Sequence, residues 1–112
     1  ELTEARVRSF AEARQFNETA IALSLLSDLP IGAVERALVH DRSDQVLLVA
    51  KYVGLAWDTC KSILQMKAVI NRRPIFDVEK HHASFDRLMP ETTRTAIQFY
   101  RLRERATTGL TK

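Results

Sequence analysis

Apolar residues recur along this chain at the three- and four-residue spacing of an amphipathic helix, and no window shows sustained alternation of apolar and polar positions. Capping residues, Pro or Gly divide the pattern into seven segments. We therefore predict an all-α protein, an irregular bundle of about seven helices built from stacked helical hairpins. The predicted helices cover roughly residues 3–15, 17–28, 30–40, 43–54, 55–70, 76–88 and 90–106.

The predicted helix boundaries depend on a few residues. Thr3, Asn17 and Ser43 precede their segments and can accept a hydrogen bond from the free backbone amides at a helix start. Gly54 is placed to end the fourth helix, because glycine adopts the left-handed conformation at little cost. After the last helix we expect a frayed tail over residues 107–112.

A weak internal repeat relates the second and third predicted helices to the fourth and fifth. At a constant offset of 26 residues, Leu29, Val34, Ala37 and Leu38 recur as Leu55, Cys60, Ile63 and Leu64. Each copy is a helix, a tight turn and a helix, and stacked hairpins of this kind bury a continuous core. The expected core consists of Leu23, Leu26, Val34, Leu38, Val49, Val53, Trp57, Ile63, Leu64, Phe99 and Tyr100.

The chain has 112 residues, 46% of them apolar and 28% charged, which fits a single domain over residues 1–112. The lone Cys60 cannot form an internal disulfide, so a cytoplasmic setting is the simplest interpretation. There is no signal segment and no apolar run near the ~18 residues of a membrane span, so we expect no membrane contact. Because it begins with Glu1 rather than Met, the chain is compatible with being the C-terminal part of a longer protein.

The strongest local signal is the hairpin over residues 46–66, whose pattern resembles a DNA-binding helix-turn-helix. Ala50 supplies the small residue where two helices cross, and Gly54 supplies the turn. The residues that would then be exposed to contact base edges are Lys61, Ser62 and Gln65. Any steeply crossed pair of helices needs the same pattern, however, and the repeat uses this geometry twice. We therefore favour a structural hairpin and keep DNA binding as the alternative hypothesis.

Positive charge is concentrated in the second half of the chain. Residues 1–56 hold six basic and eight acidic side chains, while residues 57–112 hold eleven and six. On the last predicted helix, one stripe collects Arg94, Gln98, Arg101 and Arg105. Arginine pairs well with carboxylates and phosphates, so this stripe is our candidate partner-binding site, although a solvated helix face is the commoner meaning of such a pattern. Replacing Arg101 and Arg105 with Glu should then weaken partner binding without unfolding the domain.

No group of residues indicates catalysis, a metal or a cofactor. His81 and His82 have Asp77 and Asp86 four positions away, but adjacent helical residues point about 100° apart, so no site collects three metal ligands. There is no glycine-rich phosphate loop and no Ser or Cys beside a general base. We therefore predict a protein that is not an enzyme and needs no cofactor.

Several stretches of the chain resemble the helical family known as domain of unknown function 2336. They are Leu29-Pro30, residues 34–38, residues 50–64 with Gly54-Leu55 and Trp57, and residues 91–103 with Thr95, Phe99, Tyr100 and Arg103. The resemblance implies an alphaproteobacterial, cytoplasmic, all-helical protein without assigned functional residues. The chain departs from the family pattern at Ala56, where a Ser or Thr cap is expected, and this weakens the predicted start of the fifth helix.

The sequence thus predicts a non-enzymatic protein-interaction or regulatory module. Its partner would contact the basic last helix or an apolar groove between hairpins. A protein is the preferred partner and nucleic acid is the alternative, while a homo-oligomer is compatible with the same surfaces.

Overall fold

The computed structural model describes residues 2–40, 42–74 and 77–110, except for the side chains of residues 107–110. Over these ranges the chain forms seven α-helices and no strand, which confirms the predicted all-α class. The helices are α1 (Glu4–Glu12), α2 (Phe16–Ser27), α3 (Ile31–Val39), α4 (Asp44–Tyr52), α5 (Trp57–Asn71), α6 (Val78–Arg87) and α7 (Pro90–Leu110).

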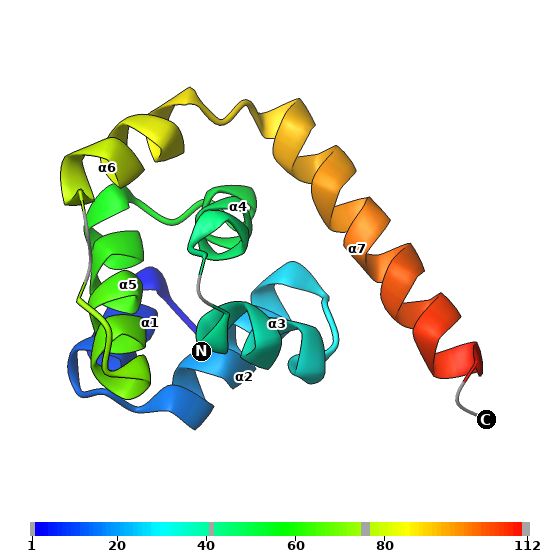
Figure 1. The fold of residues 1–112 in the computed structure, drawn as a ribbon, viewed down its shortest axis with the longest axis horizontal. Coiled ribbons are helices and arrows are strands. Elements are labelled where there is room, and N and C mark those ends of the chain that lie inside the picture. Colours follow the sequence, from blue (N-terminus) through cyan, green and yellow to red (C-terminus); the bar gives the residue numbers. More distant parts are fainter. Residues whose placement is uncertain (1, 41, 75–76, 111–112) are drawn as a thin grey trace.

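Helix α4 lies at the centre of the bundle and contacts α2, α3, α5, α6 and α7. Figure 1 shows α5 on one side of α4 and α7 on the other, with α1 packed against α5. The sequence of α4 explains this position, because four of its nine residues are buried apolar side chains. They are Val46, Leu47, Val49 and Ala50.

The two hairpins of the repeat use the same turn. Asp28, with φ 56°, follows α2, and Gly54, with φ 86°, lies in the turn after α4. Each turn therefore contains a left-handed residue at the same position of the 26-residue repeat. The apolar residues that define the repeat are all buried. The α4–α5 hairpin is therefore packed within the bundle.

The starts of the helices follow the predictions in part. The Thr3 hydroxyl accepts a hydrogen bond from the Arg6 amide at 3.3 Å, which confirms the first cap. The prediction for Asn17 is wrong, because α2 begins at Phe16, whose side chain packs against the core. Ser43 occupies the N-cap position of α4 as predicted, but its side chain makes no capping hydrogen bond.

Two predicted core residues are exposed. Leu26 on α2 is 39% exposed and Phe99 on α7 is 59% exposed, because the faces that carry them point away from the bundle. The other predicted core residues are buried or, for Val53, Trp57 and Tyr100, partly buried against the core.

The last helix is longer than predicted. The expected frayed tail is wrong for residues 107–110, because α7 continues to Leu110, while residues 111–112 lie outside the described residues. Once a helix is formed, each further residue adds a backbone hydrogen bond at little cost, so Thr and Gly extend it. The predicted start of the sixth helix at Phe76 also lies outside the described residues, and α6 begins at Val78.

Replacing Gly54 with alanine should lower the free energy of unfolding by about 1 kcal/mol, because a side chain disfavours the left-handed conformation. No atom lies within 4 Å of the added Cβ, so the effect would be conformational rather than steric. Gly32 is the matched control: it lies inside α3, and its added Cβ meets the flexible Arg36 guanidinium at 3.4 Å. Gly32→Ala should leave stability unchanged or raise it. Urea denaturation of both variants checks this, and equal effects would contradict the turn assignment.

Candidate functional site

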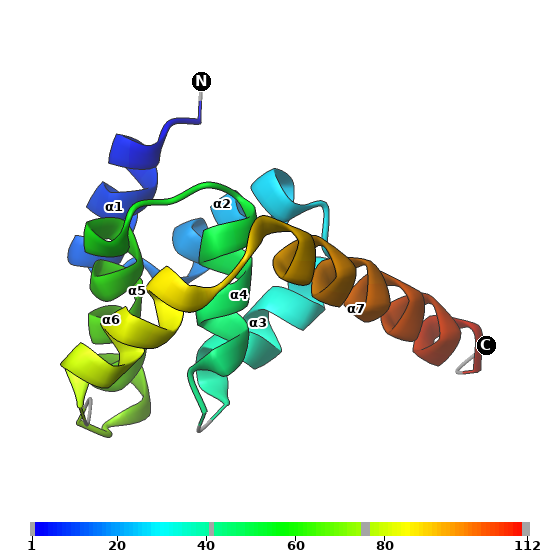
Figure 2. The same ribbon diagram turned by 90° about the horizontal axis from the view of Figure 1, so that it is seen from above.

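Helix α7 is anchored to the bundle by contacts that reach from Thr93 to Glu104. Thr93 and Ile97 are buried, and the helix packs against α4. Its C-terminal half extends past the other helices, as the two perpendicular views in Figures 1 and 2 show. The outer face of α7 and its C-terminal end are therefore open to solvent.

Arg101 belongs to the packed side of α7, contrary to its predicted role. Its guanidinium donates hydrogen bonds to the Ser27 carbonyl at 2.6 Å, the Asp28 carbonyl at 3.1 Å and the Tyr52 hydroxyl at 3.2 Å. These contacts satisfy carbonyls at the end of α2 that have no partner within the helix. Arg101 therefore joins α7 to α2, and we now expect Arg101→Glu to destabilise the fold as well as to alter the surface.

The other three residues of the predicted stripe are exposed. Arg94, Gln98 and Arg105 all lie on the surface of α7. At 100° per residue they fall within a narrow range of direction around the helix, as predicted. The structure therefore leaves a basic border of two arginines and one glutamine.

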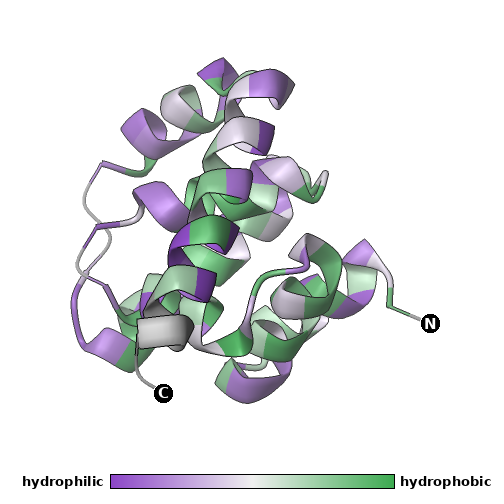
Figure 3. Ribbon diagram, turned by 90° about the vertical axis from the view of Figure 1, so that its right-hand side faces the viewer, coloured by the Kyte–Doolittle hydropathy of each residue, from purple (hydrophilic) through white to green (hydrophobic). Residues whose placement is uncertain are grey.

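An apolar stripe, which the sequence analysis missed, runs beside this border. Phe99 is 59% exposed, Leu102 is 62% exposed, and Ala106 is also exposed. Their spacing of three and four residues places them on one face, and this spacing was visible in the sequence. We call these three residues the α7 stripe. In Figure 3 the ribbon of α7 carries both hydrophobic and hydrophilic bands.

A small groove lies between α3, α4 and α7. Its volume is about 180 Å³, and its apolar lining includes Leu29, Val34, Val49 and Tyr100. Arg36 of α3 and Glu104 of α7 also line it and form a salt bridge. Because ligand pockets usually measure ≈ 300–1,000 Å³, this groove has room for one large side chain rather than a cofactor.

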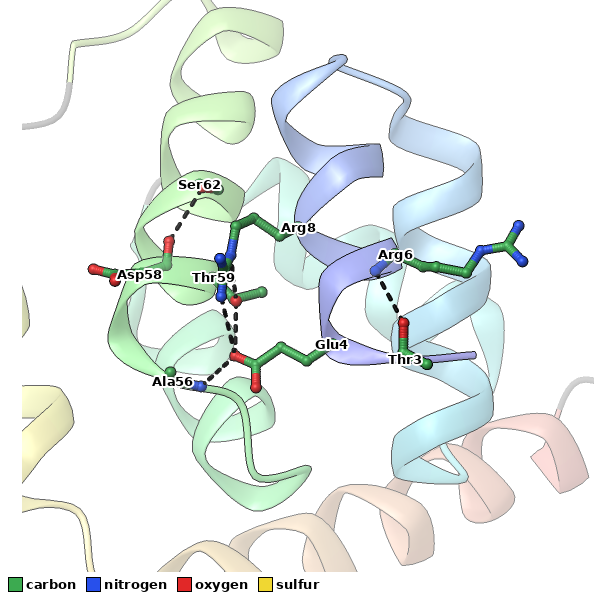
Figure 4. Close-up of polar contacts among 8 residues, drawn as sticks. All are labelled: Thr3, Glu4, Arg6, Arg8, Ala56, Asp58, Thr59 and Ser62. Atoms are coloured by element: carbon green, nitrogen blue, oxygen red, sulfur yellow. Dashed lines mark hydrogen bonds and ion pairs between the residues drawn. The ribbon is translucent and has the colours of Figure 1, made fainter. Parts of the chain in front are cut away.

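The start of α5 is capped from α1 rather than by its own preceding residue. The Glu4 carboxylate accepts hydrogen bonds from the Ala56 amide and the Thr59 hydroxyl, each at 2.7 Å (Figure 4). Arg8 Nε donates to the same Thr59 hydroxyl at 3.0 Å. Glu4 thus caps the start of α5 from another helix, as the glutamate of a capping box does when it accepts from the N-cap amide.

The capping contacts also set the protonation state of Glu4. Partial burial alone would raise the pKa of this carboxyl group, but the hydrogen bonds from Thr59 and Ala56 and the charge of Arg8 outweigh it. The pKa of Glu4 therefore lies below its ordinary value. A carboxylate at a helix start is further favoured by the helix dipole.

Helix α5 exposes only part of the face that the DNA-binding alternative requires. Lys61 and Gln65 are exposed, but Ser62 is only 8% exposed and its hydroxyl donates to the Asp58 carbonyl at 3.1 Å (Figure 4). The expectation that Ser62 is exposed is wrong, because α1 packs against α5. Two carboxylates, Glu4 and Asp58, lie at the start of the helix, where a recognition helix would approach phosphates.

A larger cleft of about 440 Å³ is lined by residues of α4, α5 and α6 and of the segments beside them. Two of its cations, Arg42 and Lys67, are already engaged within the fold. Arg42 pairs with Asp44 at 2.6 Å, and the Lys67 ammonium donates to the His40 carbonyl. This cleft is therefore a poorer candidate for ligand binding than its size suggests.

His82 and Cys60 both pack against other residues of the fold. The His82 ring stacks on Trp57 with centroids 4.6 Å apart, and its Nε2 lies 3.4 Å from a carboxylate oxygen of Asp86. Among the described residues, no three His, Cys, Asp or Glu side chains are grouped to hold a metal. Cys60 is buried, and burial raises the pKa of its thiol to about 12. A thiol in this state is a poor nucleophile.

Residues 1–98 match a protein family described as an uncharacterised protein conserved in bacteria (DUF2336). The chain belongs to this family. The matched region takes in α1 to α6 and the beginning of α7, which confirms the family resemblance, and it ends just before the α7 stripe. Comparisons with curated proteins and with solved structures found no match.

No helix of the described ranges combines the length and the apolar composition that crossing a membrane requires.

Proposed function

We propose that this protein is a non-enzymatic interaction module and that the α7 stripe, with its arginine border, binds an amphipathic helix of a protein partner. The observation that carries the proposal is the exposure of Phe99 and Leu102 side by side on a helix that projects from the bundle. Large apolar side chains that share one exposed face are typical of interaction sites.

The geometry of the stripe favours a helical partner. Phe99, Leu102 and Ala106 repeat with helical spacing, and a second helix packs its own apolar residues against such a row. Fully burying a Phe or Leu side chain contributes about 1.5–3 kcal/mol, so two of them can anchor a small interface. Arg94 and Arg105 beside the stripe favour acidic residues on that partner.

The DNA-binding alternative has less support. It requires α5 to enter the major groove, but α1 packs against α5 and the Glu4 carboxylate caps its first turn. Negative charge at that position repels phosphates. Fluorescence anisotropy with a random-sequence DNA duplex across a salt series tests it. Tight, salt-sensitive binding that is lost when Lys61 and Gln65 are replaced would favour DNA over a protein helix.

Replacing both Phe99 and Leu102 with Asp should weaken binding of an acidic amphipathic helix by about tenfold or more, which corresponds to about 1.4 kcal/mol. The probe is a fluorescein-labelled helical peptide with leucines at i, i+3, i+4 and i+7 and glutamates on both borders of that face. Binding is measured by fluorescence anisotropy at fixed salt.

The matched control for this double variant is Val69→Asp on α5, where a side chain that is 50% exposed lies on a different helix. A second peptide, with lysine in place of glutamate, tests the charge preference and should bind more weakly. Equal affinities for the wild type, the double variant and the control would overturn the proposal.

A further inference from the structure

Helix α2 has an exposed apolar face that the bundle does not cover. Apolar residues are distributed around the whole circumference of α2, as expected for a helix that is surrounded by protein. Ala20 and Leu23 are buried, yet Ile21 is 51% exposed and Leu25 is 72% exposed. Ile21 and Leu25 lie one turn apart, and we call them the α2 face.

The charged residues of α2 and of its C-cap are acidic. Glu18 and Asp28 are exposed at its two ends, and α2 contains no basic residue. The α7 stripe has the opposite character, because Arg94 and Arg105 border it. Exposed Glu91 also lies on this side of α7, at its start, so the charge beside the α7 stripe is mainly but not wholly positive, whereas the charged residues of α2 are acidic.

The dimensions of the two surfaces also agree. Glu18 and Asp28 are ten positions apart, which spans about 15 Å at the helical rise of 1.5 Å per residue. Arg94 and Arg105 are eleven positions apart, which spans about 16 Å. Two helices packed side by side place both pairs of opposite charges at matching separations, with Phe99 and Leu102 between the two arginines in sequence.

We propose that the α7 stripe of one copy of this chain packs against the α2 face of a second copy. Both surfaces are exposed in the same structure, so they do not cover each other within one chain. The inference rests on the proposed function, because it names the partner of the same α7 stripe. A two-fold pair makes this contact twice, since each copy carries both surfaces.

Charge exchange tests the proposal. Sedimentation velocity is measured on the wild type, on an Arg94→Glu, Arg105→Glu variant and on a Glu18→Arg, Asp28→Asn variant. Asn is chosen at position 28 because it also tolerates the left-handed conformation found there. We expect the wild type to associate and each variant alone to be monomeric, because the first sets acidic residues against acidic residues, and the second sets one arginine against arginine and removes the other acidic partner. An equimolar mixture of the two variants should associate again, because the exchanged charges are complementary between the two chains.

Controls separate this inference from the proposed function. Circular dichroism must show that each variant is folded, and Val69→Asp should associate like the wild type. A monomeric wild type at the highest soluble concentration overturns the self-association, and so does a mixture that stays monomeric. In either case, binding of the acidic peptide to the α7 stripe still decides the proposed function independently. Self-association that both charge variants retain would overturn the assignment of both surfaces.

Discussion

Replacing Arg101 with alanine is expected to lower the free energy of unfolding by about 3 kcal/mol, the largest effect of any surface substitution proposed for this protein. Its guanidinium donates to two carbonyls at the end of α2 and to the Tyr52 hydroxyl. The carbonyls of Ser27 and Asp28 have no partner within their own helix. Removing the arginine therefore leaves both carbonyls without this hydrogen-bond donor. Urea denaturation followed by circular dichroism measures the loss.

Two further variants show whether the effect comes from these hydrogen bonds. Arg105→Ala removes the same side chain from an exposed position of the same helix and should change stability by less than about 0.5 kcal/mol. Arg101→Lys keeps the charge but cannot reproduce the forked contact, so it should restore less than half of the loss. If Arg101→Ala and Arg105→Ala were equally stable, the connection between α7 and α2 would have no energetic role.

Replacing Glu4 with alanine is expected to lower the free energy of unfolding by about 2 kcal/mol at neutral pH. The substitution removes the acceptor for the Ala56 amide and the Thr59 hydroxyl, and thereby the contact that caps the start of α5. Glu12→Ala is the control, because it removes an exposed glutamate from the other end of α1. Equal effects of the two substitutions would contradict the capping role.

The same contact gives stability a defined pH dependence. The folded-state pKa of Glu4 lies below its ordinary value of 4.5, so protonation favours the unfolded state. The contribution of Glu4 is complete above that ordinary value and is lost as the pH falls through the folded-state pKa. Urea denaturation in steps below pH 4.5 should therefore show the difference between the wild type and Glu4→Ala shrinking. A difference that stays constant over this range would show that the charge of Glu4 is not involved.

The elements of this fold could be predicted from short stretches of sequence. Apolar spacing identified all seven helices, Gly54 marked the turn between α4 and α5, and the 26-residue repeat identified two similar hairpins. These features depend on interactions between residues a few positions apart, such as backbone hydrogen bonds within one helix and the conformational freedom of one glycine. For that reason a single sequence was sufficient to identify them.

The candidate site depended on contacts that local patterns do not contain. Arg101 looked like a member of a solvated stripe, yet its partners lie 73 and 74 positions away on α2. Ala56 looked like a weak helix start, yet its cap comes from Glu4, 52 positions earlier. Apolar spacing placed Phe99 on a helix face but could not tell whether another helix covers that face.

The division between the two kinds of information has a simple physical origin. Helix formation and turn geometry depend on residues that are close to one another in the sequence. The sequence therefore specified an all-α bundle of hairpins. Burial and capping across the bundle follow from which helices meet, and an amphipathic pattern does not name its partner. The positions of α1 against α5 and of α7 against α4 therefore decided that Ser62 is buried, that Arg101 is structural and that the α7 stripe is exposed.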